Sequence, residues 1–208
     1  VDAPLHAEEI AMRLTVPLIA LFATLASCGE APTPSAALTA PAKEGAWRID
    51  KAASRITFTG TQNGKEFTGA FERFDATIQL DPDNLGDASI EAIIDTASAK
   101  SGDRQRDAAL PGADWFASKA FPSARFQSDL IVATRPDAYE ATGALSIRGT
   151  ERPLTLPFTL VIKDGRAVAD AEVVLNRTDF GVGQGDDFVT DKWVGYKVGV
   201  AIHLEAVR

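Results

Sequence analysis

The stretch that decides the fold is Val194–Glu205, VGYKVGVAIHLE, near the end of the 208-residue chain. Every second position in it is apolar or aromatic: Val194, Tyr196, Val198, Val200, Ile202 and Leu204. Successive side chains of a β-strand point to opposite faces of the sheet, so a period of two predicts a strand with one buried face. The positions between them, Lys197 to Glu205, are charged or small and belong on the other face.

The same alternation recurs back to Arg55. It is found in residues 55–59, 67–71, 74–80, 90–94, 124–132, 139–147, 154–162 and 169–175. Asn63-Gly64 and Asp164-Gly165 are hairpin signals. The apolar parity changes between Phe71 and Phe74, which predicts a bulge or bend there. Short turns between adjacent strands favour an antiparallel sheet.

We therefore predict an all-β fold of about eight antiparallel strands. Such a sheet can close into a barrel, which removes its exposed edges, or form a two-sheet sandwich. Alternation alone fits both. Residues 101–119 differ, because they show no period of two. Asp103 and Asp114 are candidate N-caps, so one or two short helices are expected in this segment, interrupted at Pro111-Gly112.

Composition excludes several functional classes. The chain is 45% hydrophobic and has a net charge of -8, which gives little attraction for a nucleic-acid backbone. One cysteine cannot form an intrachain disulfide, and His6 and His203 lack the spacing of a zinc site. No metal site, no nucleic-acid partner and no cofactor other than a bound lipid or quinone-like ligand are expected.

The N-terminal region resembles an export signal. Met12-Arg13 precedes a short apolar run, and Leu25-Ala-Ser-Cys28 resembles the bacterial lipobox, in which cleavage leaves a lipidated Cys28. The acidic residues 1–11 do not suit a signal peptide and are interpreted as an upstream extension assigned by error. We expect a signal peptide at 12–27, a Pro- and Ala-rich tether at 28–45 and the folded domain at 46–208. The expected location is the bacterial periplasm, and Gly29 rather than Asp favours the outer membrane over the inner one.

Several segments carry a family resemblance. They are TFTGTQNGKEFTG (57–69), GADWF (112–116), FPSARF (121–126), GALSIRG (143–149) and NRTDFGVG (176–183). In this order they resemble the YceI-like family of lipid and polyisoprenoid-binding proteins, over about Trp47 to Leu204. The resemblance implies a lipocalin-like eight-stranded antiparallel barrel with a long apolar cavity that holds an isoprenoid or fatty-chain molecule without turnover.

The resemblance is incomplete at two positions. Many family members carry histidines where this chain has Ala53 and Asn63, so no role of those imidazoles transfers. The chain looks closer to the branch found beside a membrane cytochrome b561. That analogy implies this cytochrome as a partner and a quinone as a ligand.

The inward face of the predicted strands supplies the candidate binding residues. The cavity is predicted to be lined by Ile56, Phe58, Phe67, Phe71, Phe74, Ile90, Phe126, Leu145, Leu156, Phe158, Leu175, Phe180 and Val198. Small residues on the same face would leave room for a ligand. They are Gly69, Ala76, Ala92, Ala141, Gly143, Ala169 and Ala171.

The non-strand segment is the candidate mouth of the barrel. There Trp115 and Phe116 could close over a lipid tail, while Arg104 or Arg106, with Asp107, could meet a polar or phosphorylated head group. A solvated helix face and ordinary core packing explain the same residues.

Arg177 and Asp179 precede the glycine-rich turn at 181–185, and we interpret them as an ion pair that fixes this corner. No catalytic motif is visible, so the chain is predicted to carry a lipid rather than to be an enzyme. The alternatives are an enzyme or redox partner that acts on such a lipid, and a scaffold with a filled interior.

Overall fold

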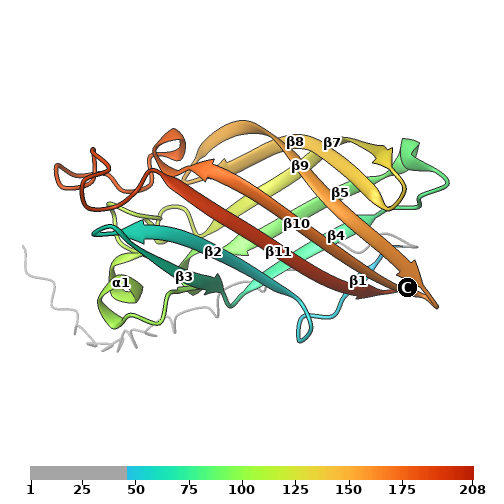
Figure 1. The fold of residues 1–208 in the computed structure, drawn as a ribbon, viewed down its shortest axis with the longest axis horizontal. Helices are drawn as coiled ribbons and strands as arrows, with labels where there is room; N and C mark the ends of the chain where they lie inside the picture. Colours follow the sequence, from blue (N-terminus) through green and yellow to red (C-terminus); the bar gives the residue numbers. More distant parts are fainter. Residues whose placement is uncertain (1–45) are drawn as a thin grey trace, which may run out of the picture. The chain divides into compact units, whose positions relative to one another are not determined.

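The computed structural model describes residues 46–208, and this part of the chain is all-β (Figure 1). Eleven strands form one antiparallel sheet: β1 (Arg48–Ile49), β2 (Arg55–Gln62), β3 (Lys65–Phe71), β4 (Phe74–Gln79), β5 (Ser89–Asp95), β6 (Ala99–Lys100), β7 (Ser123–Arg135), β8 (Ala138–Ile147), β9 (Thr150–Lys163), β10 (Arg166–Asn176) and β11 (Lys197–Val207). Between them lie the helix α1 (Arg104–Ala109) and three 3-10 turns, η1 (Leu85–Asp87), η2 (Thr96–Ser98) and η3 (Arg177–Phe180). The predicted antiparallel all-β fold is confirmed.

These eleven strands make eight strands of a barrel. β3 continues into β4 after a break at Glu72-Arg73, and β5 continues into β6 after η2. The two long strands pair along both halves, because β4 pairs with β5 and β3 pairs with β6. On its other side β3 pairs with β2, so the pairing order returns to the strand from which it started. Counting each joined pair once and leaving out the two-residue β1 gives eight, as predicted for a barrel rather than a sandwich.

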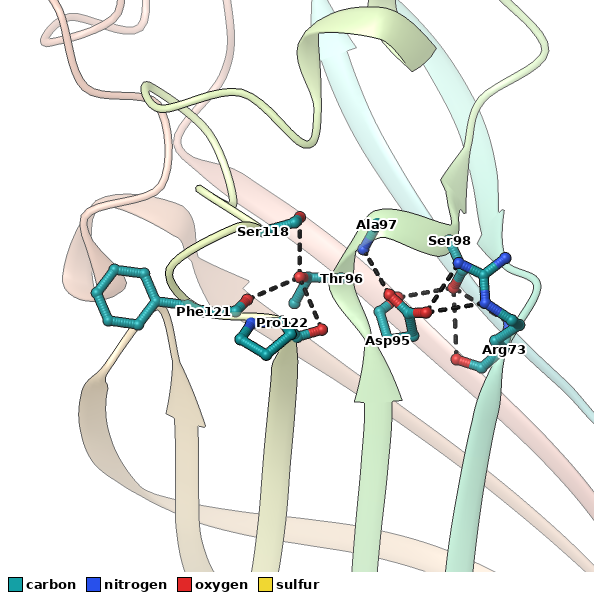
Figure 2. Close-up of polar contacts among 8 residues, drawn as sticks. All are labelled: Arg73, Asp95, Thr96, Ala97, Ser98, Ser118, Phe121 and Pro122. Atoms are coloured by element: carbon teal, nitrogen blue, oxygen red, sulfur yellow. Dashed lines mark hydrogen bonds and ion pairs between the residues drawn. The ribbon is translucent and has the colours of Figure 1, made fainter. Parts of the chain in front are cut away.

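The predicted irregularity between Phe71 and Phe74 is part of a break in the barrel wall. We call this break, which comprises Glu72-Arg73 and η2, the joint (Figure 2). Both long strands break at this level, and the backbone groups that lose sheet partners must find others. The fully buried Ser98 hydroxyl accepts from Arg73 N at 3.1 Å and donates to Asp95 O at 2.7 Å. The Arg73 guanidinium pairs with the Asp95 carboxylate at 2.8 Å. The joint therefore keeps its two broken strands together through side chains.

Thr96, beside this joint, fixes the segment that follows α1 to the barrel wall. Its hydroxyl lies 2.9 Å from Ser118 Oγ, 2.9 Å from Phe121 O and 3.1 Å from Pro122 O (Figure 2). The Thr96 backbone N–H also donates to Pro122 O at 3.0 Å. Because Thr96 is buried, these groups are screened from water, and their hydrogen bonds hold residues 118–122 in one position on the barrel wall.

The insertion between β6 and β7 contains one short helix, within the expected one or two. Asp103 is its N-cap as predicted, and its carboxylate accepts from Gln105 N at 3.0 Å and Arg106 N at 2.9 Å. The helix predicted to open at Asp114 does not form, and residues 111–120 are turns. Ala117 has a left-handed φ of 48°, which ends any α-helical run, and Asp114 O instead accepts from the backbone of the glycine-rich turn.

The two ends of the barrel are built differently. One end, the mouth, consists of residues 62–65, 101–122, 148–149 and 177–196; α1 marks it in Figure 1. At the opposite end Trp47 pairs with Ile78 and its indole N–H donates to Leu80 O at 2.9 Å. Trp47 is buried and closes this end. The predicted extension (1–11), signal peptide (12–27), Cys28 and tether (28–45) lie outside the described residues.

Candidate functional site

The barrel encloses an apolar cavity of about 260 Å³. Forty residues line it, drawn from the strands β2, β3, β4, β5, β7, β8, β9, β10 and β11 and from two of the four mouth segments, 101–122 and 177–196. Asp75 and Arg177 are the only charged residues among them. Lining of this kind desolvates a hydrocarbon chain without burying unpaired polar groups, so the cavity suits an apolar ligand.

The structure places all thirteen predicted cavity residues in this lining. Phe58, Phe126 and Phe158 are buried, and the phenylalanines nearest the mouth form a chain of ring contacts. The ring centroids of Phe58 and Phe71 are 5.3 Å apart, and those of Phe71 and Phe116 are 5.8 Å apart. The aromatic packing of the barrel wall thus continues into the mouth segment 101–122. A role of these residues in binding stays a prediction.

Four of the seven small residues line the cavity as expected: Ala76, Ala92, Ala169 and Ala171. The other three do not create room. A Cβ at Gly69 would collide with the Phe58 ring and Lys100 O, and one at Gly143 would collide with Gln127 O and Ser128 Cα. Gly143 allows close approach of β8 to β7 beside the register shift at Ser128/Leu130, and Ala141 is packed in the core.

Arg177 is the main polar feature of the cavity wall. The predicted ion pair between Arg177 and Asp179 is wrong, because the Arg177 guanidinium bonds only to backbone carbonyls. Its side chain is buried between the rings of Trp115 (5.8 Å) and Tyr196 (5.5 Å). Burial lowers the pKa of the guanidinium from its ordinary value, but arginine remains charged at neutral pH. Its hydrogen-bond partners are all backbone carbonyls: Gly195 O (3.0 Å), Val182 O (2.9 Å), Gly183 O (3.1 Å), Phe188 O (2.8 Å) and Val194 O (3.0 Å).

Gly183 is required for this arrangement. It has a φ of 80°, and a Cβ there would collide with Arg177 Nη1. A side chain at 183 would both strain the backbone and displace the guanidinium. The glycine-rich turn therefore surrounds the buried guanidinium of Arg177.

Arg148 connects the mouth segment 101–122 to the glycine-rich turn at 181–185. It lies in a hairpin turn with Gly149, and both residues have positive φ, 52° and 72°. Its Nη1 lies 2.8 Å from Trp115 O and 2.9 Å from Gly181 O, and its Nη2 donates to Gln184 Oε1 at 2.9 Å. One side chain thus fixes the turn segment after α1 against the glycine-rich turn.

The predicted mouth residues divide into two groups. Trp115 and Phe116 line the cavity, and Trp115 also packs on Phe188 at 4.9 Å. Arg104 and Asp107 lie outside it, in a shallow depression with Lys100 and Gly102. Arg104 and Asp107 therefore do not line the cavity, and their role in binding a head group stays a prediction.

Asp107 instead orders the start of the insertion. Its carboxylate accepts from Ser101 N at 2.6 Å and Ser101 Oγ at 2.8 Å. The Ser101 N–H lowers the pKa of the Asp107 carboxyl below its ordinary value of 3.8, and the Arg106 N–H does the same for Asp103.

Arg106, the second arginine that we considered for the mouth, packs against the hairpin between β2 and β3. Its guanidinium lies 4.2 Å from the centroid of the Phe67 ring, and Nη1 donates to Gln62 Oε1 at 2.8 Å. These contacts hold α1 against the hairpin between β2 and β3. Neither Arg148 nor Arg177 was predicted as a mouth residue; the glycine that follows Arg148 and the glycine-rich turn after Arg177 were the only signals in the sequence.

Within residues 46–208, no group of three potential metal ligands is present. The one described histidine, His203, pairs with Asp170 at 2.7 Å on the outer face of the barrel, away from the cavity. No helix in the described part of the chain is long and apolar enough to cross a membrane.

Comparison with known proteins agrees with this architecture. The family model described as the YceI-like domain matches residues 47–206. The chain belongs to the YceI-like family. A UPF0312 protein of Pseudomonas putida (strain W619) is 31% identical over 120 residues, which is 55% of this chain and 62% of the relative. A UPF0312 protein of Vibrio cholerae is 26% identical over 133 residues, 64% of this chain and 57% of the relative. The chain thus spans about three fifths of the length of these curated relatives.

Two solved structures share the fold. Burkholderia cenocepacia BcnA superposes with a TM-score of 0.73 and 30% identity, over 76% of this chain and 99% of that one. A polyisoprenoid binding domain from Saccharophagus degradans gives a TM-score of 0.63 at 13% identity, over 77% of this chain and 97% of that one. The predicted membership of the YceI-like family is confirmed.

Proposed function

We propose that this YceI-like protein binds one long apolar molecule, an isoprenoid lipid, quinone or fatty chain, and carries it in the barrel. The cavity carries the proposal: thirty-eight of its forty lining residues are uncharged, and nearly all of these are hydrocarbon or aromatic. The fold shared with a domain named for polyisoprenoid binding supports it.

Burial of the tail would supply the affinity. Each buried CH₂ contributes about 0.8 kcal/mol, so a tail of about ten methylene groups gains roughly 8 kcal/mol before the entropy cost of association. Binding by burial needs no catalytic group. The protein is therefore proposed as a carrier rather than an enzyme.

The proposed location is the periplasm, with Cys28 as a lipid anchor to the outer membrane. The lipobox-like sequence before Cys28 supports this, as does the Pro- and Ala-rich segment that follows. A quinone ligand and a membrane cytochrome b561 as partner remain proposals from the family resemblance. The mass of the mature N-terminus would test the anchor.

Native mass spectrometry of protein purified from its own membrane tests carriage. We expect a co-purifying lipid that is lost when the cavity is filled. Ala169→Phe adds a ring inside the barrel on β10, whereas Val174→Phe adds one on the exposed outer face of the same strand. Loss of lipid in the first variant only, with little loss of stability, supports carriage. A large stability loss in Ala169→Phe, of about 1 to 3 kcal/mol, together with no lipid in the parent protein, contradicts it.

A further inference from the structure

One loop of the mouth exposes apolar side chains to solvent. Val189 is 61% exposed and Trp193 is 46% exposed, and both lie on the loop 186–193, at the end of the barrel that α1 marks (Figure 1). The other two tryptophans of the chain differ, because Trp47 is buried and Trp115 lines the cavity. Exposing a valine and an indole on one short loop is unfavourable in water, so this loop is a candidate contact surface.

Trp193 is fixed at the rim of the mouth by the β2–β3 hairpin. Its carbonyl accepts from Asn63 N at 2.8 Å, and the next residue, Val194, forms a bridge with Gln62. Lys192 Nζ lies 4.7 Å from the centroid of the indole ring. An indole beside a flexible ammonium suits a membrane interface, because the ring favours the headgroup boundary and a lysine can extend its charge to the polar layer.

Val189 is held in solvent by contacts on both of its sides. The Tyr196 hydroxyl donates to Val189 O at 3.0 Å. Arg177 acts as a brace of the mouth, and its Nη2 donates to Phe188 O at 2.8 Å. The Phe188 ring packs on Trp115, with the ring centroids 4.9 Å apart. Phe188 is thus turned to the lining of the cavity, and Val189 cannot follow it inward without breaking these contacts.

The charges of the mouth balance, whereas those of the rest of the barrel do not. The mouth carries seven Lys and Arg, including the exposed Lys65, Arg104, Lys119 and Lys192, against seven Asp. The other described residues carry twelve Lys and Arg against seventeen Asp and Glu. A lipid surface with negative charge therefore repels the mouth less than it repels the wall or the closed end.

The loop itself does not attract anionic lipid. It contains Asp186, Asp187 and Asp191 against the single cation of Lys192. Contact with a bilayer must therefore rest on burial of the valine and the indole, and it needs no anionic lipid.

We propose that the loop 186–193 is a membrane-docking surface, in which Val189 and Trp193 enter the headgroup region of a lipid bilayer and place the mouth of the barrel against it. The opening of the cavity then faces the bilayer, so an apolar chain can pass between the two without crossing bulk water. Two side chains give a weak and reversible contact, which allows the protein to leave again. Docking needs no ligand in the cavity; only its use in loading rests on the proposed carrier function.

Matched valine variants test the docking surface. Val189 and Val174, on the outer face of β10, are 61% and 65% exposed, so Val→Ala removes the same apolar groups from two equally exposed sites. Every protein is the full chain with Cys28→Ser, which gives all variants the same N-terminal region without a lipid anchor. We expect partition onto phosphatidylcholine vesicles, measured by co-sedimentation, to fall about threefold for Val189→Ala and about tenfold for Trp193→Ala. Val174→Ala should leave it unchanged.

Fluorescence quenching tests the orientation of the docked barrel. Phosphatidylcholine brominated on its acyl chains should quench tryptophan emission, and Trp193→Phe should remove most of this quenching. Equal partition of Val189→Ala and Val174→Ala, or no quenching that depends on Trp193, overturns the docking surface and leaves carriage intact. A parent protein that ignores vesicles but forms a dimer that Val189→Ala dissociates also overturns it, and assigns the loop to a second copy of the chain. Docking without any co-purifying lipid would instead contradict carriage alone.

Discussion

The two ends of the barrel use the same kinds of residue in different ways. At the closed end Trp47 is held by strand pairing to Ile78, and Arg208 lies 4.8 Å from its ring. At the mouth Trp115 sits on a turn, and Arg177 lies 5.8 Å from its ring. Strand pairing fixes the closed end together with the Trp47 and Arg208 side chains, which both donate to Leu80 O, whereas the mouth is fixed mainly by side chains that reach loop carbonyls. The difference teaches that one end belongs to the cooperative fold and the other can open locally.

The largest expected effect is at the closed end. Trp47→Ala removes a buried indole and its hydrogen bond to Leu80 O, and we expect it to lower the free energy of unfolding by about 4 kcal/mol. Urea denaturation measures the change. Trp193→Ala, at a partly exposed tryptophan, is the matched control and should cost little. Equal losses in the two variants would remove the distinction between a structural end and a mobile one.

Arg177→Met should have the next largest effect. It leaves several buried carbonyls without donors, so we expect a loss of about 3 kcal/mol in the free energy of unfolding. Arg177→Lys keeps the charge with fewer donors and should fall between parent and Met variant. A loss below about 1 kcal/mol for Met would show that the carbonyls find water, and that the brace is dispensable.

Trp115→Ala should affect ligand exchange more than stability. The ring covers the cavity but its backbone is not part of a strand, so we expect ligand to dissociate roughly tenfold faster while unfolding changes by less than half of the Trp47→Ala effect. Stopped-flow fluorescence gives the rate. Hydrogen exchange in residues 101–119 should slow on loading; exchange already as slow as in the strands, and indifferent to ligand, would place the entrance elsewhere.

The smallest expected effect is a pH dependence at α1. The folded-state pKa values of Asp103 and Asp107 are lowered, so their contribution to ordering is complete above the unfolded value of about 3.8 and is lost as pH falls through the lower folded values. The protection factors of the amides of residues 101–109 against hydrogen exchange should therefore fall below about pH 4. Asp107→Asn should weaken this response. An unchanged profile would show that the Ser101 contact does not hold the helix.

The barrel wall could be predicted because a period of two assigns each side chain to a face. That is why all thirteen cavity residues, from Ile56 to Val198, fall in the lining. Gly143 is an exception: it shares the inward parity of its strand but does not line the cavity, because its small size serves the approach of β8 to β7. An alternation pattern carries no information about strand spacing.

The mouth could be predicted only as a location. The choice of Arg106 over Arg104 depends on contacts with Gln62 and Phe67, about forty residues earlier in the chain. The carbonyls that Arg177 binds lie in irregular backbone, where any residue type offers the same acceptor. Local sequence therefore indicated a corner at Arg177 but named the wrong partner, Asp179.

The position of Trp47 has a practical consequence. Ala46, where the described chain begins, and Arg208, where it ends, both lie at the closed end of the barrel, and Figure 1 marks the C-terminus there. A tag, fluorophore or sensor surface attached at Arg208 therefore leaves the opening unobstructed. Conversely, a fusion partner meant to block loading is better inserted into the β2–β3 hairpin or the 186–193 loop than attached at Arg208, because both of these loops belong to the mouth.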